Sequence, residues 1–119
     1  MDKDKFFRSF GFAIGGIKVA LKEQNLRFYL LSAIIVIILA ILTGLTIIEW
    51  CIIIIVIFLV LAAEIFNTAI EKVVDLVSPN FHPLAKAAKD IAAGAVLVIA
   101  SMSVIIEILI FIPKWISLF

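Results

Sequence analysis

Residues 50–77 read WCIIIIVIFLVLAAEIFNTAIEKVVDLV, an apolar run that passes directly into a stretch of regularly spaced carboxylates. The uncharged part, residues 50–63, is shorter than the roughly 20 residues that a membrane-spanning helix needs. The polar residues that follow it keep helical spacing, so we predict one long helix over residues 50–77 that crosses a membrane and continues beyond it. Pro79 and Pro83 should end this helix, because the residue before a proline disfavours helical backbone.

Two further apolar stretches flank this segment, at residues 28–48 and 91–112. Both are long enough to span a bilayer on apolar content alone. None of the three runs alternates apolar and polar residues as the strands of a membrane barrel do, and a lone apolar segment in lipid must satisfy its backbone as a helix. The sequence therefore predicts an all-α integral membrane protein of one domain, with transmembrane helices over residues 28–48, 50–77 and 84–112.

The composition excludes other classes of protein. Of 119 residues, 66% are hydrophobic and only 16% are charged, whereas soluble domains are about half apolar and disordered chains are polar. Ten basic residues nearly balance nine acidic ones, so the charge suggests no nucleic-acid partner. The single cysteine, Cys51, cannot form a disulfide within the chain.

The basic residues predict the orientation in the cell membrane. The connection at residues 43–49 contains none of them, and a single lysine, Lys114, follows the third run. The positive-inside rule then places the N-terminus and the second connection in the cytoplasm, and the first connection and the C-terminus outside. The remaining basic residues lie before the first run or between the second and third runs: Lys3, Lys5, Arg8, Lys18, Lys22, Arg27, Lys72, Lys86 and Lys89.

The first 27 residues have an amphipathic pattern of their own. Six apolar side chains follow one another at spacings of 1, 3, 4, 3 and 4, and most of the basic residues lie off that stripe. This pattern predicts a helix over residues 1–27 that lies on the membrane surface, in contact with membrane lipids. The segment lacks a small-residue cleavage pattern, so we expect no signal peptide. The apolar side chains are Phe6, Phe7, Phe10, Ile14, Ile17 and Leu21.

Polar side chains follow the apolar part of the second helix on a single face. Glu64, Asn67, Thr68, Glu71 and Asp75 lie at offsets 0, 3, 4, 7 and 11, which one face of a helix accommodates. Three carboxylates on one stripe repel one another, and a carboxylate at the membrane boundary is costly unless it is paired or bound to a cation. The neighbouring lysine at position 72 should point away, so the stripe predicts a cation site.

A second polar cluster follows the PNFHP turn at residues 79–83. Lys86, Lys89 and Asp90 lie at offsets 0, 3 and 4 at the start of the third helix, whose N-terminus adds partial positive charge. Magnesium prefers oxygen ligands and keeps bound phosphates, and lysines suit phosphates. The two clusters therefore predict a metal–nucleotide site at the cytoplasmic surface. The alternative is structural: Glu71 with Lys89, and Asp75 with Lys86, would be ion pairs that close the hairpin.

The remaining polar residues predict no further chemistry. We expect Glu107, near the outer end of the third run, to reach the surface or to pair with Lys114. Glu49 should be an ordinary interfacial residue, and His82, between two prolines, would by itself be a turn residue. The phosphate-binding motifs GxxxxGK[ST] and GxGxxG are absent from the sequence, so a nucleotide site here would have to be built from helices.

The segments EIFNTAIEKVVD (residues 64–75) and HPLAKAAKDIAAGAV (residues 82–96) together resemble the small bacterial membrane lipid kinases, the diacylglycerol kinase and undecaprenol kinase family. The shared pattern is ExxNxAIExxxD followed by AKDxxxxAV, and the resemblance covers nearly the whole chain. It implies a homotrimeric helical bundle with three spans and one surface helix per chain. It also implies transfer of the γ-phosphoryl group of MgATP to a lipid hydroxyl at the cytoplasmic face.

The resemblance also assigns roles to individual residues. Glu64 takes the position of the catalytic base, and Asn67 supports it. Glu71, together with Glu23 in the segment KEQNLR, takes the position of a magnesium ligand. Arg8 and Phe12 resemble a basic and an aromatic position of the surface helix that contact ATP or the lipid. The resemblance places the ATP site at Glu23, Glu71, Asp75, Asn80, Phe81, His82, Lys89 and Asp90.

The identity of the lipid stays open at this level. The segments IIEW (residues 47–50) and HPLAKAAKDIAAGAV look most like the Gram-positive branch of the family, which acts on undecaprenol; the other branch acts on diacylglycerol. The chemistry of the residues does not distinguish the two alcohols. A hypothesis of another class also remains, in which the chain is a non-catalytic channel subunit or assembly partner whose polar stripe holds helices together.

Overall fold

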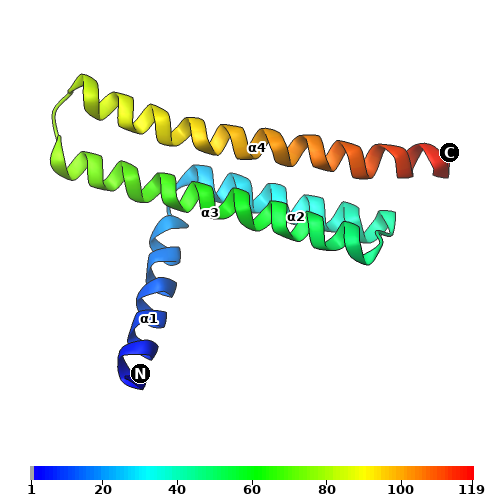
Figure 1. Cartoon of the computed structure of the whole chain (residues 1–119), viewed down its shortest axis with the longest axis horizontal. Helices are drawn as coiled ribbons and strands as arrows, with labels where there is room; N and C mark the ends of the chain where they lie inside the picture. The colour runs from blue at the N-terminus through cyan, green and yellow to red at the C-terminus, as the bar shows by residue number, and fades with distance from the viewer. Residues whose placement is uncertain (1) are drawn as a thin grey trace.

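The computed structural model describes residues 2–119 as four helices: α1 (Lys3–Ala20), α2 (Gln24–Thr43), α3 (Ile47–Val77) and α4 (Pro83–Leu118). Helices α2, α3 and α4 are long and apolar enough to cross a membrane, which confirms the prediction of three candidate spans. These three helices run side by side, whereas α1 runs crosswise to them (Figure 1). Strands are absent from the described residues.

The turn between α2 and α3 lies inside the range predicted for the first span. Helix α2 ends at Thr43 because Gly44 takes a φ of +80° at the C-cap, a backbone conformation that glycine adopts without strain. Helix α3 then begins with a capping box: the Thr46 hydroxyl accepts from the backbone N–H of Glu49 at 3.2 Å, and the Glu49 carboxylate accepts from that of Thr46 at 2.9 Å. The helix therefore ends five residues before the predicted end at residue 48, and Glu49 is a structural cap. At its other end α2 begins at Gln24, so residues 24–27 belong to this helix and not to the surface helix predicted over residues 1–27.

The turn between α3 and α4 lies at the opposite end of the bundle from the α2–α3 turn (Figure 1). Helix α3 ends at Val77, as the prolines predict, and Pro83 occupies the first turn of α4. His82 is the N-cap of α4, and its Nδ1 accepts a hydrogen bond from the backbone N–H of Leu84 at 3.1 Å. The ring of His82 therefore satisfies one of the amides at the start of α4.

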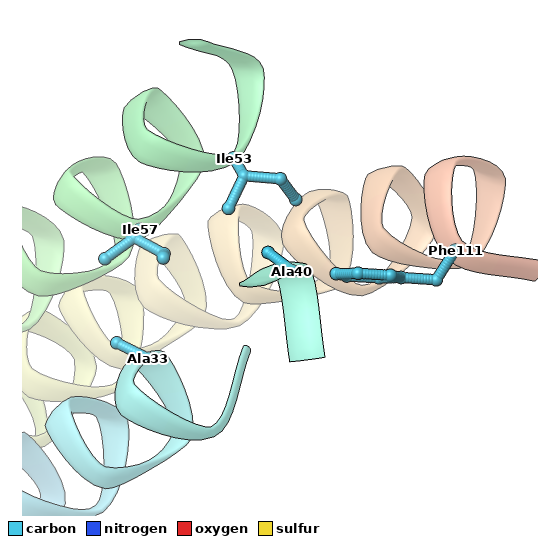
Figure 2. Close-up of a cluster of buried hydrophobic side chains, with 5 residues drawn as sticks. All are labelled: Ala33, Ala40, Ile53, Ile57 and Phe111. Atoms are coloured by element: carbon cyan, nitrogen blue, oxygen red, sulfur yellow. The ribbon is translucent and has the colours of Figure 1, made fainter. Parts of the chain in front are cut away.

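Buried apolar side chains from all three long helices meet in one cluster (Figure 2). Helix α2 contributes Ala33 and Ala40, α3 contributes Ile53 and Ile57, and α4 contributes Phe111. The small alanine side chains allow close approach between helices, which is how helices associate where lipid removes the hydrophobic driving force. Helix α3 has the most extensive contacts with its neighbours, so it forms the centre of the chain.

Two polar contacts tie the end of α4 to the α2–α3 turn. The Trp115 indole N–H donates to the Thr43 hydroxyl at 2.8 Å, and Lys114 Nζ lies 2.9 Å from Glu49 Oε1. The expected pair between Lys114 and Glu107 is therefore wrong. Those two residues are seven apart, about 10 Å along one helix, whereas the start of α3 lies beside Lys114. These contacts accompany the continuation of α4 beyond the predicted end at residue 112.

We expect Trp115→Phe to lower the free energy of unfolding by about 1 kcal/mol, because it removes one partly buried hydrogen bond and keeps an aromatic ring. The measurement is unfolding of the detergent-solubilised protein. Thr43→Val removes the same hydrogen bond from the other side. The double variant should therefore lose no more free energy of unfolding than either single variant does. Fully additive losses would contradict a direct bond between the two side chains.

Candidate functional site

The first three residues of the polar stripe of α3 are buried within the single chain, whereas Glu71 is half-buried and Asp75 is exposed. Glu64 and Asn67 are each 4% exposed, and Thr68 is buried as well. A side chain at the end of α1, Ala20, and one at the start of α2, Leu26, are also buried, and α1 contacts α3. Because a buried carboxylate is costly without a partner, the burial of Glu64 makes this face the leading candidate for a functional site.

Hydrogen bonds satisfy only part of this buried face. The Asn67 side-chain amide donates to Glu71 Oε1 at 3.2 Å, and the Thr68 hydroxyl donates to the backbone carbonyl of Glu64 at 3.0 Å. Asn67 Oδ1 is buried and has no hydrogen-bond partner within residues 2–119. A buried acceptor without a partner is unfavourable, so Asn67 offers a hydrogen-bond acceptor that a ligand hydroxyl could use.

Glu23 joins the carboxylates of α3 from the connection between α1 and α2. It is the N-cap residue of α2, and its Oε1 lies 3.9 Å from Lys72 Nζ. Through this contact Glu23 lies beside the polar part of α3, the helix that also carries Glu64 and Glu71. Among the described residues, Lys72 pairs with Glu23 from another segment and with none of the carboxylates of the polar stripe, as the spacing along α3 predicted.

A polar pocket of about 370 Å³, the hairpin pocket, lies where α3 and α4 meet. It contains every residue between positions 75 and 90 that the sequence assigned to a nucleotide site. It also contains Lys86, which belongs to the polar cluster predicted at the start of the third helix, although the resemblance gives it no role. The residues predicted for the site that line the hairpin pocket are Asp75, Asn80, Phe81, His82, Lys89 and Asp90.

The ion pairs of the hairpin pocket differ from the predicted ones. Lys89 pairs with Asp75 across the hairpin, and Lys86 pairs with Asp90 one turn further along α4, at 2.6 Å. The expected pairs of Glu71 with Lys89 and of Asp75 with Lys86 do not form among the described side chains, because the i, i+4 spacing already gives Lys86 a partner. Exposed pairs of this kind contribute little stability, so a phosphate could displace the carboxylates at small cost.

Two predicted residues lie apart from these clusters. Arg8 and Phe12 are on α1, and neither lines the hairpin pocket. Arg8 donates from Nε to the backbone carbonyl of Asp4 in its own helix at 3.3 Å, and Phe12 is 77% exposed. Within one chain, these two residues are not brought to the candidate site.

The donor set fits a magnesium ion that arrives with phosphates. Within residues 2–119, no three histidine, cysteine or acidic side chains lie close enough to hold a metal by themselves. Magnesium in nucleotide sites usually takes only one or two carboxylates and completes its shell with phosphates and water. Glu23 and Glu71 can supply these two carboxylates, next to a pocket whose lysines suit phosphates.

Comparisons with known proteins agree with this chemistry. The family model described as prokaryotic diacylglycerol kinase matches residues 11–111. An undecaprenol kinase of Bacillus subtilis is 50% identical over 112 residues, which are 93% of this chain and 91% of that protein. A diacylglycerol kinase of Synechocystis is 40% identical over 92% of this chain and 64% of its own length. One from Helicobacter pylori is 36% identical over 79% and 74%.

Proposed function

The chain belongs to the prokaryotic diacylglycerol kinase family, and on that premise we propose that it phosphorylates undecaprenol at the cytoplasmic face of the cell membrane. Family membership makes it a lipid kinase in a membrane with transmembrane helices, with ATP as the phosphoryl donor. One observation carries the choice of lipid: the undecaprenol kinase of Bacillus subtilis is 50% identical and aligns with 93% of this chain.

Glu64 is the proposed general base. It is buried where the apolar run of α3 passes into its polar stripe, so a lipid hydroxyl can reach it from the bilayer while ATP comes from water. The hydroxyl oxygen forms a bond to the γ-phosphorus, the bond from that phosphorus to the β–γ bridging oxygen breaks, and ADP leaves. The hydroxyl proton passes to the Glu64 carboxylate. Asn67, whose side-chain amide donates a hydrogen bond to Glu71, supports the base.

Glu23 and Glu71 are the proposed ligands of Mg²⁺, which when bound would neutralise charge on the phosphates. When ATP enters the hairpin pocket, Lys89 gives up its ion pair with Asp75 and pairs with a phosphate oxygen. Positioning and charge neutralisation are most of what phosphoryl transfer requires from a protein. The other residues proposed to bind ATP are Asn80, Phe81, His82 and Asp90.

We also propose the topology and the assembly. Helices α2, α3 and α4 cross the membrane with the N-terminus and the hairpin pocket in the cytoplasm and the C-terminus outside, and α1 lies on the membrane surface. The chain assembles as a homotrimer, in which Arg8 and Phe12 serve ATP or lipid bound to a neighbouring copy. This assignment is supported by their position outside the hairpin pocket of their own chain.

Diacylglycerol is the second candidate lipid. The description of the family model that matches residues 11–111 names diacylglycerol kinase, and relatives from Synechocystis and Helicobacter pylori are diacylglycerol kinases. Both alcohols present a primary hydroxyl at the membrane surface, so the same base and the same ATP site would serve either of them.

A phosphoryl-transfer assay tests the proposal. It offers the two alcohols side by side in mixed micelles, with labelled ATP and magnesium. We expect kcat/KM for undecaprenol to exceed that for diacylglycerol by about tenfold, which corresponds to about 1.4 kcal/mol of discrimination. The reverse order would select diacylglycerol. Transfer to neither alcohol by folded protein would indicate a non-catalytic membrane subunit.

A further inference from the structure

A second hollow lies within the apolar segments, away from the hairpin pocket. This transmembrane groove has a volume of about 460 Å³ and is formed by α2, α3 and α4. Its size is in the range of small-molecule and cofactor sites. Most of its walls are apolar, with a polar pair on α4; its lining includes Phe28, Val36, Ile57, Val60, Ser103 and Glu107.

The transmembrane groove begins close to the proposed general base. Val60 lines the groove and precedes Glu64 by four residues, so the two lie about one helical turn apart on the same side of α3. Both side chains are buried. On α4 the lining runs from Ala100 to Glu107, which is about 10 Å of helix. A molecule whose hydroxyl reached Glu64 would therefore have an apolar path into the membrane beside it.

The far end of the transmembrane groove carries a polar pair. The Ser103 hydroxyl donates to Glu107 Oε1 at 3.0 Å, and Ser103 is buried. None of the described basic side chains forms an ion pair with Glu107. An ionisable residue inside a span is costly and marks a functional site by default. The hydrogen bond to Glu107 comes from one turn earlier on its own helix.

We propose that the transmembrane groove holds the part of the acceptor lipid's hydrocarbon chain that is nearest the hydroxyl, and that the Ser103–Glu107 pair limits how much of the chain fits. The inference rests on the proposed function, because it takes the lipid alcohol at Glu64 as its starting point. A hydrocarbon chain packs well against the apolar walls but gains nothing against a hydrogen-bonded carboxyl. The chain therefore leaves the groove sideways into the bilayer at Glu107.

Two adjacent tryptophan substitutions test the occupancy of the groove. Val104 lines it and is 53% exposed, whereas Ile105 is 57% exposed and is absent from the lining. We expect Val104→Trp to raise KM for the lipid by about tenfold, the effect of losing roughly two buried methylene contacts, and to leave KM for ATP unchanged. Ile105→Trp is the matched control and should change neither value. Equal effects of the two variants would overturn the proposal.

A chain-length series tests the role of Glu107. With water-soluble short-chain alcohols, kcat/KM should rise by about fourfold for each added methylene until the groove is full, and then level off. Glu107→Leu extends the apolar wall of the groove, so kcat/KM should level off at a longer alcohol chain than in the unmodified protein. A variant that lowers activity equally at all chain lengths would show a merely structural role for Glu107 and would contradict this part of the proposal.

Photocrosslinking separates this inference from the proposed function. An undecaprenol analogue with a diazirine on the chain near its hydroxyl should label the groove-lining segments of α2 and α4, and Val104→Trp should abolish that labelling. Labelling of the groove without any phosphoryl transfer to the analogue would support the groove as a lipid site and overturn undecaprenol as the acceptor. Transfer with labelling spread evenly over the lipid-facing surface would support the kinase assignment and overturn the groove.

Discussion

Replacement of Glu64 by glutamine should give a folded protein that still binds ATP but transfers phosphate at least about a hundredfold more slowly. Loss of a positioned general base typically costs two to four orders of magnitude. The amide keeps the shape of the side chain, and at a site only 4% exposed it avoids burying a charge. Single-turnover transfer and equilibrium ATP binding, measured on the same preparation, separate the chemical step from binding.

Glu49→Gln is the matched control for this variant. It makes the same exchange on the same helix, at the end of α3 far from the polar stripe, and glutamine can also serve in a capping box. We expect unchanged transfer. If Glu64→Gln instead lost its fold or its assembly while Glu49→Gln stayed intact, the polar stripe would be a packing device and the base would have to be sought elsewhere.

Glu71→Gln should raise the magnesium concentration required for half-maximal transfer and lower kcat/KM for ATP by about a hundredfold. The substitution removes one of the two charges proposed to hold the cation, and interactions that stabilise transferring phosphates are of this magnitude. The glutamine carbonyl can still accept the hydrogen bond that Asn67 now donates to Oε1 at 3.2 Å, so the local structure should persist. A magnesium titration at fixed ATP measures the change.

Two controls accompany the magnesium titration. Chelation by EDTA should abolish transfer by the unmodified protein, and Glu49→Gln should require no more magnesium than the unmodified protein does. An unchanged magnesium requirement in Glu71→Gln, with transfer reduced, would mean that this carboxylate acts on the nucleotide or on Asn67 and does not hold the cation.

Local spacing predicted much of the candidate site. Glu64, Asn67 and Thr68 lie on one helix, so their offsets alone bring them to one face, and the structure buries all three. The residues of the hairpin pocket are close in sequence to a single turn, bounded by two prolines, and for that reason they were also predictable. Sequence spacing along one helix says nothing, however, about which neighbouring segment faces a given side chain.

The ion pairs show where this limit lies. Lys89 could meet Glu71 or Asp75 on α3, and only the relative offset of the two helices selects Asp75. In the same way, Lys72 meets Glu23 because the α1–α2 connection passes beside α3. Lys114 meets Glu49 in preference to a carboxylate of its own helix, because the start of α3 lies beside the end of α4.

The sequence by itself determined that this chain forms membrane helices, since apolar runs of this length have no other way to satisfy their backbone in lipid. It also determined which polar side chains share a face, because the helical period is a local property. The tertiary structure alone decided the partners of the charged residues and the existence of the transmembrane groove, whose walls come from three separate helices. Both depend on how the helices are rotated and offset against one another, which side-chain packing decides.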